Sequence, residues 1–148
     1  AEAGLPAYEH LIRSCDASFD EGYRTVRMCE ERLGEIDGIF AQSDIAALGA
    51  LEALGELRID VPGQIAVVGY DDIRMSGIVR PRLTTVHQPH REIVQRACSR
   101  LVAMLSGTDT GTGPALQEII RPRLIVRETA PDPAAASSQR AEGTRGED

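Results

Sequence analysis

Short apolar runs alternate along the first half of the chain with segments whose apolar residues recur every three or four positions. The runs at 10–15, 38–42 and 65–70 predict strands, and the helical spacing within 18–33 and 44–57 predicts helices. Run 65–70 is short, β-branched and bounded by turn residues and acids, which predicts a strand buried on both faces. This order of strands and helices is typical of a parallel α/β sheet with right-handed crossovers.

Capping residues predict where the two helices begin and end. Ser18 and Glu21 form an S-x-x-E capping box at the start of the first helix, and Gly34 is expected to end it. Ser43 or Asp44 is expected to cap the second helix. Both helices therefore have defined starting points between predicted strands.

The pattern changes after the third predicted strand. A helix is predicted at about 90–106, and the chain beyond 131 is expected to be disordered because it is rich in Pro, Ala, Ser, Gly and charge. The remaining predictions are an irregular stretch at 74–89 with one short apolar-alternating piece around 83–86, a flexible loop at 107–113, and two short strands within 116–120 and 123–128. Three parallel strands make a thin sheet, and the chain begins with Ala1. We therefore expect it to be part of a larger protein.

The helix at 44–57 is apolar around most of its circumference. Its large apolar residues are spaced every three positions and sweep about 240° of the surface, whereas packing on one sheet needs only about a 100° stripe. These residues are Ile45, Leu48, Leu51, Leu54 and Leu57. Either the helix is buried in the core or it forms a subunit interface, and the small amount of chain available to bury it favours the interface.

Charge and composition narrow the range of functions. The net charge is −7 over 148 residues, so these residues lack the basic footprint of nucleic-acid binding. Apolar runs are too short for a membrane span. The three cysteines form no CxxC pair, and we expect reduced thiols in a cytosolic protein. No nucleophile elbow, Walker motif or zinc signature occurs, so we expect no cofactor, no metal and no enzymatic activity.

Two carboxylates, Asp71 and Asp72, follow the strand at 65–70 directly. Ligands of open parallel sheets bind at the carboxyl ends of strands, so Asp71 is a candidate for holding a small molecule. Adjacent residues in an extended segment point to opposite sides, which disfavours a shared acid–base role and predicts a structural or solvent-facing role for Asp72. A plain strand-end turn remains the alternative. His87 and His90 lie three apart, but Pro89 between them disfavours a metal site.

Four segments together resemble the lac-repressor/galactose-repressor family of bacterial transcription regulators. They are "FDEGY" (19–23), "GIFAQSDIAALGALEALGELRIDVPGQIAVVGYDD" (38–72), "RPRLTTVHQP" (80–89) and "RLIVRET" (123–129). The resemblance implies a type I periplasmic-binding-protein-like sensor of two α/β lobes with a ligand cleft between them. Residues 1–130 would be the later part of the second lobe, including a return helix at about 90–106 that completes the first lobe.

The resemblance also implies roles for individual residues. Asp71 matches the aspartate that accepts hydrogen bonds from the effector, Ser43 stands where the family usually has an effector-binding asparagine, and Ala17 stands at an often aromatic position. Gln88 and His90 fall in the segment that forms the hinge and lines the cleft. Leu48, Leu51 and Val79 fall where the family dimerises.

The function implied by this resemblance is that of a ligand-responsive regulator in the cytoplasm. Its effector would be a sugar or related polar metabolite, and it would act as a homodimer. Operator DNA would be contacted only through an N-terminal helix-turn-helix outside these residues. The alternative is a solute-binding protein of a sugar uptake system, which shares the fold.

Overall fold

The structure is a computed structural model that describes residues 11–14, 16–108 and 118–132. Strands and helices alternate in the first half, as the sequence predicts. In chain order the elements are α1 (Phe19–Met28), the 3-10 helix η2 (Glu30–Glu35), β1 (Gly38–Phe40), α2 (Asp44–Glu56), β2 (Ala66–Asp71), the 3-10 helix η3 (Arg74–Gly77), β3 (Thr84–His87), α3 (His90–Leu105) and β4 (Arg123–Ile125).

The strands form one sheet in the order β1-β2-β3-β4. β1, β2 and β3 are parallel, with Phe40 opposite Val68 and Val68 opposite Thr84. β4 runs antiparallel to β3, with Leu124 opposite Val86. The predicted α/β class with a mainly parallel sheet is therefore confirmed.

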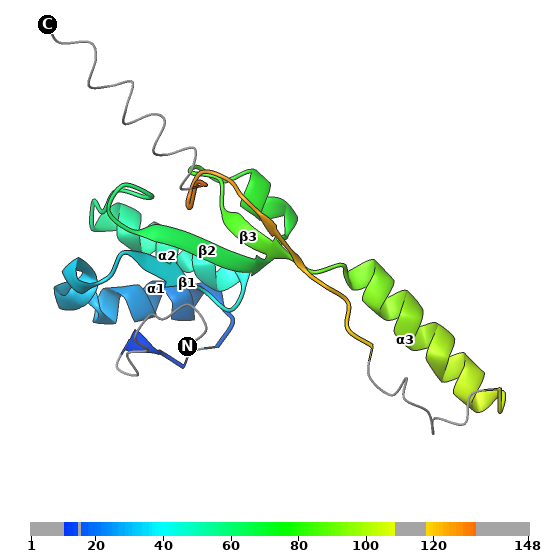
Figure 1. The fold of residues 1–148 in the computed structure, drawn as a ribbon. Helices are drawn as coiled ribbons and strands as arrows, with labels where there is room; N and C mark the ends of the chain where they lie inside the picture. The colour runs from blue at the N-terminus through cyan, green and yellow to red at the C-terminus, as the bar shows by residue number, and fades with distance from the viewer. Residues whose placement is uncertain (1–10, 15, 109–117, 133–148) are drawn as a thin grey trace, which may run out of the picture.

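Helices α1 and α2 lie together on one face of this sheet (Figure 1). They cross with their backbones in close contact, because a Cβ at Gly49 would lie 2.0 Å from the carbonyl oxygen of Phe19, and one at Gly22 would lie 2.0 Å from that of Ala46. The core lies between these helices and the sheet. Its buried members are Val26, Leu33, Ala47, Ala50, Ala53, Leu54, Ile65, Val67 and Leu83.

The opposite face of β2 is only partly covered, so the prediction of a strand buried on both faces is wrong. Ile65, Val67 and Gly69 are buried toward the helices, whereas the residues between them are half-buried, and neighbouring Phe40 on β1 is 66% exposed. The reason lies in the topology. Right-handed crossovers that advance across a sheet in one direction place their helices on the same face.

The strand predicted at 10–15 does not form over its described part, because residues 11–14 adopt no strand. Among the described residues, β1 stands at the edge of the sheet, and a cavity lies between it and residues 11–14. Without a partner strand, the backbone of 11–14 has no ladder to join.

The first helix ends earlier than predicted. Ser18 caps α1 as expected, and its hydroxyl accepts a hydrogen bond from the Glu21 amide at 3.3 Å. The α-helix stops at Met28, however, and the chain continues through Gly34 as the 3-10 helix η2. This tighter winding directs Leu33 into the core.

Helix α3 confirms the helix predicted at about 90–106 and projects away from the sheet (Figure 1). None of its residues is buried. Of the two strands predicted near the end, one forms at 123–125, whereas residues 118–120, the described part of the other, adopt no strand. Most of the loop predicted at 107–113 and of the disordered tail lies outside the described residues. None of the described helices is long and apolar enough to cross a membrane.

Candidate functional site

The carboxyl ends of the three parallel strands meet at one edge of the sheet. Asp71 ends β2 and is half-buried, and its Oδ1 accepts a hydrogen bond from the Gln88 Nε2 at 2.9 Å. Gln88 directly follows β3, so two of the predicted effector residues come together here. A carboxylate and an amide side by side can accept from and donate to a polar ligand.

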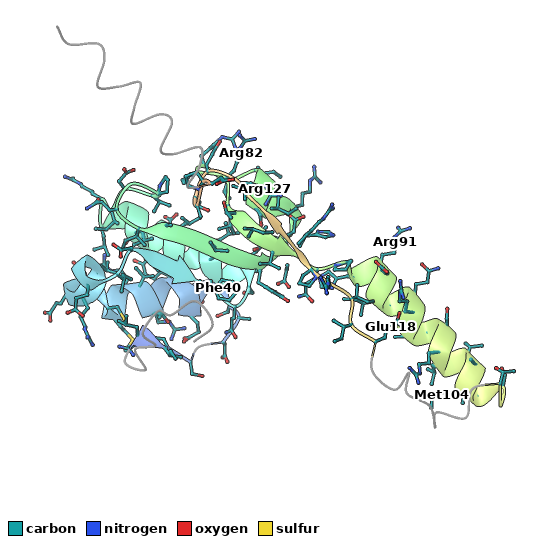
Figure 2. The ribbon with its side chains drawn as sticks, in the orientation of Figure 1. Phe40, Arg82, Arg91, Met104, Glu118 and Arg127 are labelled. Carbon is teal, nitrogen blue, oxygen red and sulfur yellow. The ribbon has the colours of Figure 1, made fainter. Side chains whose placement is uncertain are left out.

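The neighbouring carboxylate turns to different partners. Asp72 Oδ1 accepts a hydrogen bond from Arg127 Nη2 at 2.6 Å, and Asp72 Oδ2 lies 2.9 Å from His87 Nδ1. Arg127 also donates to the Leu83 carbonyl oxygen at 2.8 Å and is labelled beside the sheet in Figure 2. Asp72 therefore joins the end of β2 to β3 and to the chain that follows β4. Asp71 and Asp72 thus have different hydrogen-bond partners, and the predicted division of roles between them stays a prediction.

A low pH should weaken the contacts of Asp72 with Arg127 and His87. Burial acts to raise the pKa of Asp72, but the hydrogen bonds from Arg127 and His87 outweigh burial and hold the pKa below its ordinary value of 3.8. A pKa lowered by folding gives stability that is present above the unfolded-state pKa and is lost as the pH falls through the folded-state pKa. We expect the Asp72 contribution to be complete above about pH 5 and to be lost progressively as the pH falls below about 4 and through the folded-state pKa.

NMR titration of the Asp72 side-chain carboxyl carbon measures this effect. The midpoint should lie below that of the same group in the urea-unfolded protein, and Arg127→Gln should raise it. Equal midpoints in the folded and unfolded protein would show that the two hydrogen bonds do not stabilise the ionised carboxylate.

Ser43 and Ala17 are joined to each other. Ser43 Oγ accepts from the Ala46 amide at 3.1 Å, as an N-cap does, and donates to the Ala17 carbonyl oxygen at 3.3 Å. Ser43 is buried and Ala17 is exposed. The Ser43 hydroxyl therefore serves the start of α2 and holds the segment before α1. Its contact with an effector stays a prediction.

His90 is exposed at the first position of α3, and it is His87 that pairs with Asp72. Within the described ranges, no three His, Cys, Asp or Glu side chains are grouped as a metal site requires. Cys29 and Cys98 are free thiols.

Sequence reasoning missed Arg127 and assigned Asp44 only a possible capping role. Asp44 is fully buried and bonds to Ser76, Thr85 and the Ile73 amide. The Asp72–Arg127 pair spans 55 residues, and the Asp44–Thr85 pair spans 41. Periodicity and capping are local signals, so neither pair could be found from them.

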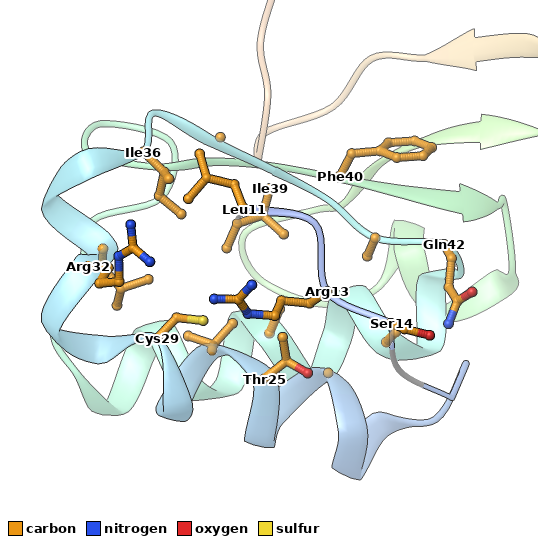
Figure 3. A pocket seen from close by; sticks show the side chains of 17 residues that line it. Leu11, Arg13, Ser14, Thr25, Cys29, Arg32, Ile36, Ile39, Phe40 and Gln42 are labelled. Atoms are coloured by element: carbon orange, nitrogen blue, oxygen red, sulfur yellow. The ribbon is translucent and has the colours of Figure 1, made fainter. Parts of the chain in front are cut away.

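The described chain also contains a hollow that Asp71 and Gln88 do not line. A cavity of about 350 Å³ opens beside β1, between α1, η2 and residues 11–14, and its lining is mainly apolar (Figure 3). None of the five predicted effector residues lines it. On its other edge β1 pairs with β2 through Asp37 and Ala41, so the peptide groups of Gly38 and Phe40 point to the outer edge beside the cavity. We interpret the cavity as space at an open sheet edge.

The parallel sheet and its helices have the architecture of one lobe of a periplasmic-binding-protein-like domain. The family described as periplasmic binding protein-like domain matches residues 1–130. The chain belongs to this family and, within it, to the lac-repressor/galactose-repressor (LacI/GalR) group.

Curated relatives support membership of this group. The HTH-type transcriptional repressor PurR of Photorhabdus laumondii is 32% identical over 132 residues, which are 88% of this chain and 38% of PurR. The HTH-type transcriptional regulator GalR of Escherichia coli is 30% identical over 141 residues, which are 95% of this chain and 40% of GalR. The chain therefore spans about two fifths of the length of these curated relatives.

Solved structures give the same picture. The E. coli transcriptional repressor AscG superimposes with a TM-score of 0.75 at 31% identity, over 88% of this chain and 46% of AscG. A complex of the transcriptional regulator CelR with cellobiose superimposes with a TM-score of 0.75 at 31% identity, over 87% of this chain and 38% of CelR.

Proposed function

We propose that this chain is the effector-sensing and dimerising part of a ligand-responsive transcription regulator. The observation that carries the proposal is the edge where Asp71 and Gln88 meet at adjacent parallel strand ends, beside the chain segments that lead to and from α3. The names of the relatives favour a regulator over a solute-binding protein of sugar uptake. A regulator acts in the cytoplasm, contacts operator DNA through a separate helix-turn-helix, and needs no catalytic group.

The polar groups at the strand ends suit a neutral polyhydroxy ligand. A carboxylate accepts hydrogen bonds from vicinal hydroxyls, and the neighbouring amide of Gln88 can donate to and accept from the same ligand. The cellobiose complex of CelR is consistent with this chemistry. We therefore propose a sugar or related polar metabolite as the effector, bound through Asp71, with Gln88, His90, Ser43 and Ala17 nearby.

The position of the site also suggests how binding could be transmitted. β3 leads into α3, and β4 returns from it, so the two segments on either side of the site connect the sheet to the rest of the sensor. An effector that contacts both lobes would favour one relative arrangement. A ligand shifts such an equilibrium only by its difference in affinity for the two arrangements.

A thermal-denaturation screen of the full-length protein with mono- and disaccharides, including cellobiose and lactose, tests the sugar proposal. A ligand that binds only the folded state at 100 times its Kd adds about 2.7 kcal/mol of stability and raises Tm. We expect at least one sugar to do so. A screen in which every sugar leaves Tm unchanged would contradict a sugar effector.

We propose that the homodimer forms over the start of α2 and the η3 region. Ile45 is 41% exposed, and Met75 and Ile78 are exposed around η3, which is joined to α2 by the Ser76–Asp44 hydrogen bond. Elsewhere α2 is covered within the chain, because Leu51, Leu54 and Leu57 lie in or against the core. Leu48, which lies three positions after Ile45 on the same helix, is half-buried. Val79 packs against the core.

Leu48→Glu should convert a native dimer of the full-length protein into monomers, because it places a charge in an apolar interface. Sedimentation velocity measures the change. Glu31→Lys changes the charge at an exposed position of η2, outside the proposed interface, and should leave the dimer intact. A dimer that survives Leu48→Glu would place the interface elsewhere.

A further inference from the structure

A buried carboxylate at the start of α2 connects three separate segments. Asp44 is fully buried and accepts hydrogen bonds from the Ile73 amide at 2.8 Å, from Ser76 Oγ at 2.6 Å and from Thr85 Oγ1 at 2.5 Å. Ser76 and Thr85 are fully buried as well. The carboxylate therefore links α2 to β3 and to the chain that follows β2.

The fold leaves room for this carboxylate and stabilises its charge. A Cβ at Gly69 would lie 2.3 Å from Asp44 Oδ1, so only glycine at this position of β2 admits the side chain as it stands. Asp44 is the first residue of α2, where the helix dipole favours a negative charge. Three donors then replace the water that burial removes.

The backbone next to this network has an unfavourable conformation. Asp71 has φ of 118° and Asp72 has φ of 57°, both in the region that non-glycine residues avoid. Such residues persist only where the surrounding structure holds them in place. The end of β2 therefore needs contacts that fix the peptide groups after Asp71.

Asp44 supplies those contacts on both sides of Asp72. The Ile73 amide donates directly to Asp44 Oδ2, and the Asp72 amide donates to Thr85 Oγ1 at 3.4 Å. Thr85 Oγ1 in turn donates to Asp44 Oδ1, which fixes the hydroxyl so that its lone pairs face the Asp72 amide. One carboxylate thus holds two consecutive amides that follow the predicted effector residue.

We propose that Asp44 is a positioning residue for the effector site: without contacting the ligand, it holds the left-handed backbone that directs Asp71 toward Gln88 and Asp72 toward His87 and Arg127. This role rests on the proposed function of Asp71. It is distinct from a general contribution to stability, because its effect is confined to the end of β2.

Hydrogen exchange followed by mass spectrometry on the full-length protein separates the two roles. Asp44→Ala removes the network, Thr85→Val removes only the bridging hydroxyl at nearly constant shape, and Leu54→Ala is the matched control that destabilises the core of the same helix. In Asp44→Ala and Thr85→Val, peptides that contain residues 72 and 73 should exchange roughly 10- to 100-fold faster, while peptides from 65–69 change far less. Leu54→Ala should accelerate both regions together.

A uniform acceleration in Asp44→Ala and Thr85→Val, matching that of Leu54→Ala, would overturn the positioning role, as would unchanged exchange at 72 and 73. Calorimetry with the sugar that most raises Tm adds a second readout. Asp44→Ala should weaken its binding by at least about tenfold, and Leu54→Ala should leave it within about twofold. If no sugar binds the unmodified protein, the sugar proposal fails, and the exchange pattern still decides the role of Asp44.

Discussion

Gly49→Ala should destabilise the protein by about 2–3 kcal/mol, whereas Gly55→Ala in the same helix should stabilise it by about 0.5–1 kcal/mol. At Gly49 the added Cβ would lie 2.0 Å from the Phe19 carbonyl oxygen and 2.8 Å from the Tyr23 nitrogen, so α1 and α2 would have to separate. A Cβ at Gly55 meets nothing within 4 Å. Only the helix propensity of alanine then acts, and it favours the folded state.

Urea unfolding followed by circular dichroism measures both variants. Because the two variants are expected to change the free energy of unfolding in opposite directions, a general effect of replacing glycine by alanine cannot explain both results. If Gly49→Ala were as stable as Gly55→Ala, the backbones of α1 and α2 would not be in contact at this crossing.

Thr129→Val should cost about 2–4 kcal/mol, although it preserves the shape of the side chain. Thr129 is fully buried, and its Oγ1 donates to the Val67 carbonyl oxygen at 2.6 Å while accepting from the Thr84 amide at 2.8 Å. The Val67 amide also donates to the Thr129 carbonyl oxygen at 2.9 Å. Thr129 thus joins β2 and β3 just before their own ladder begins at Val68 and Thr84.

The valine variant leaves two buried backbone groups without partners, and each such group costs about 1–3 kcal/mol. Thr129→Ser keeps the hydroxyl and should lose only about 1 kcal/mol for the missing methyl group. Urea unfolding measures the loss of stability in each of the two variants. Equal losses would mean that packing of the methyl group, and not the hydrogen bonds, explains the contribution of Thr129.

Local signals predicted the elements whose structure depends on local interactions. The start of α2 follows from the Ser43 cap, and the start of α1 follows from Ser18 and its bond to the Glu21 amide. The placement of Asp71 at a strand end follows from the apolar run before it. In each case the determining contacts lie within a few residues along the chain.

The wrong predictions concern features that depend on distant partners. Residues 11–14 have strand-like composition but no neighbouring strand, and β2 has an apolar pattern but helices on only one face. The Asp72–Arg127 and Asp44–Thr85 pairs join residues that lie 55 and 41 positions apart along the chain. The role of Ser43 shows the same limit, because its hydroxyl bonds to Ala17, which lies 26 residues away.

Calorimetric titration of the full-length protein with the sugar that most raises its Tm tests the central claim, that Asp71 at the end of β2 holds the effector. Asp71→Ala removes a charged acceptor and should weaken binding by about 1.5–3 kcal/mol, or roughly 10- to 150-fold. Asp37→Ala removes an exposed carboxylate from before β1, at the opposite end of the strands, and should leave the affinity unchanged. An Asp71→Ala protein that binds the sugar as tightly as the unmodified protein would contradict the claim.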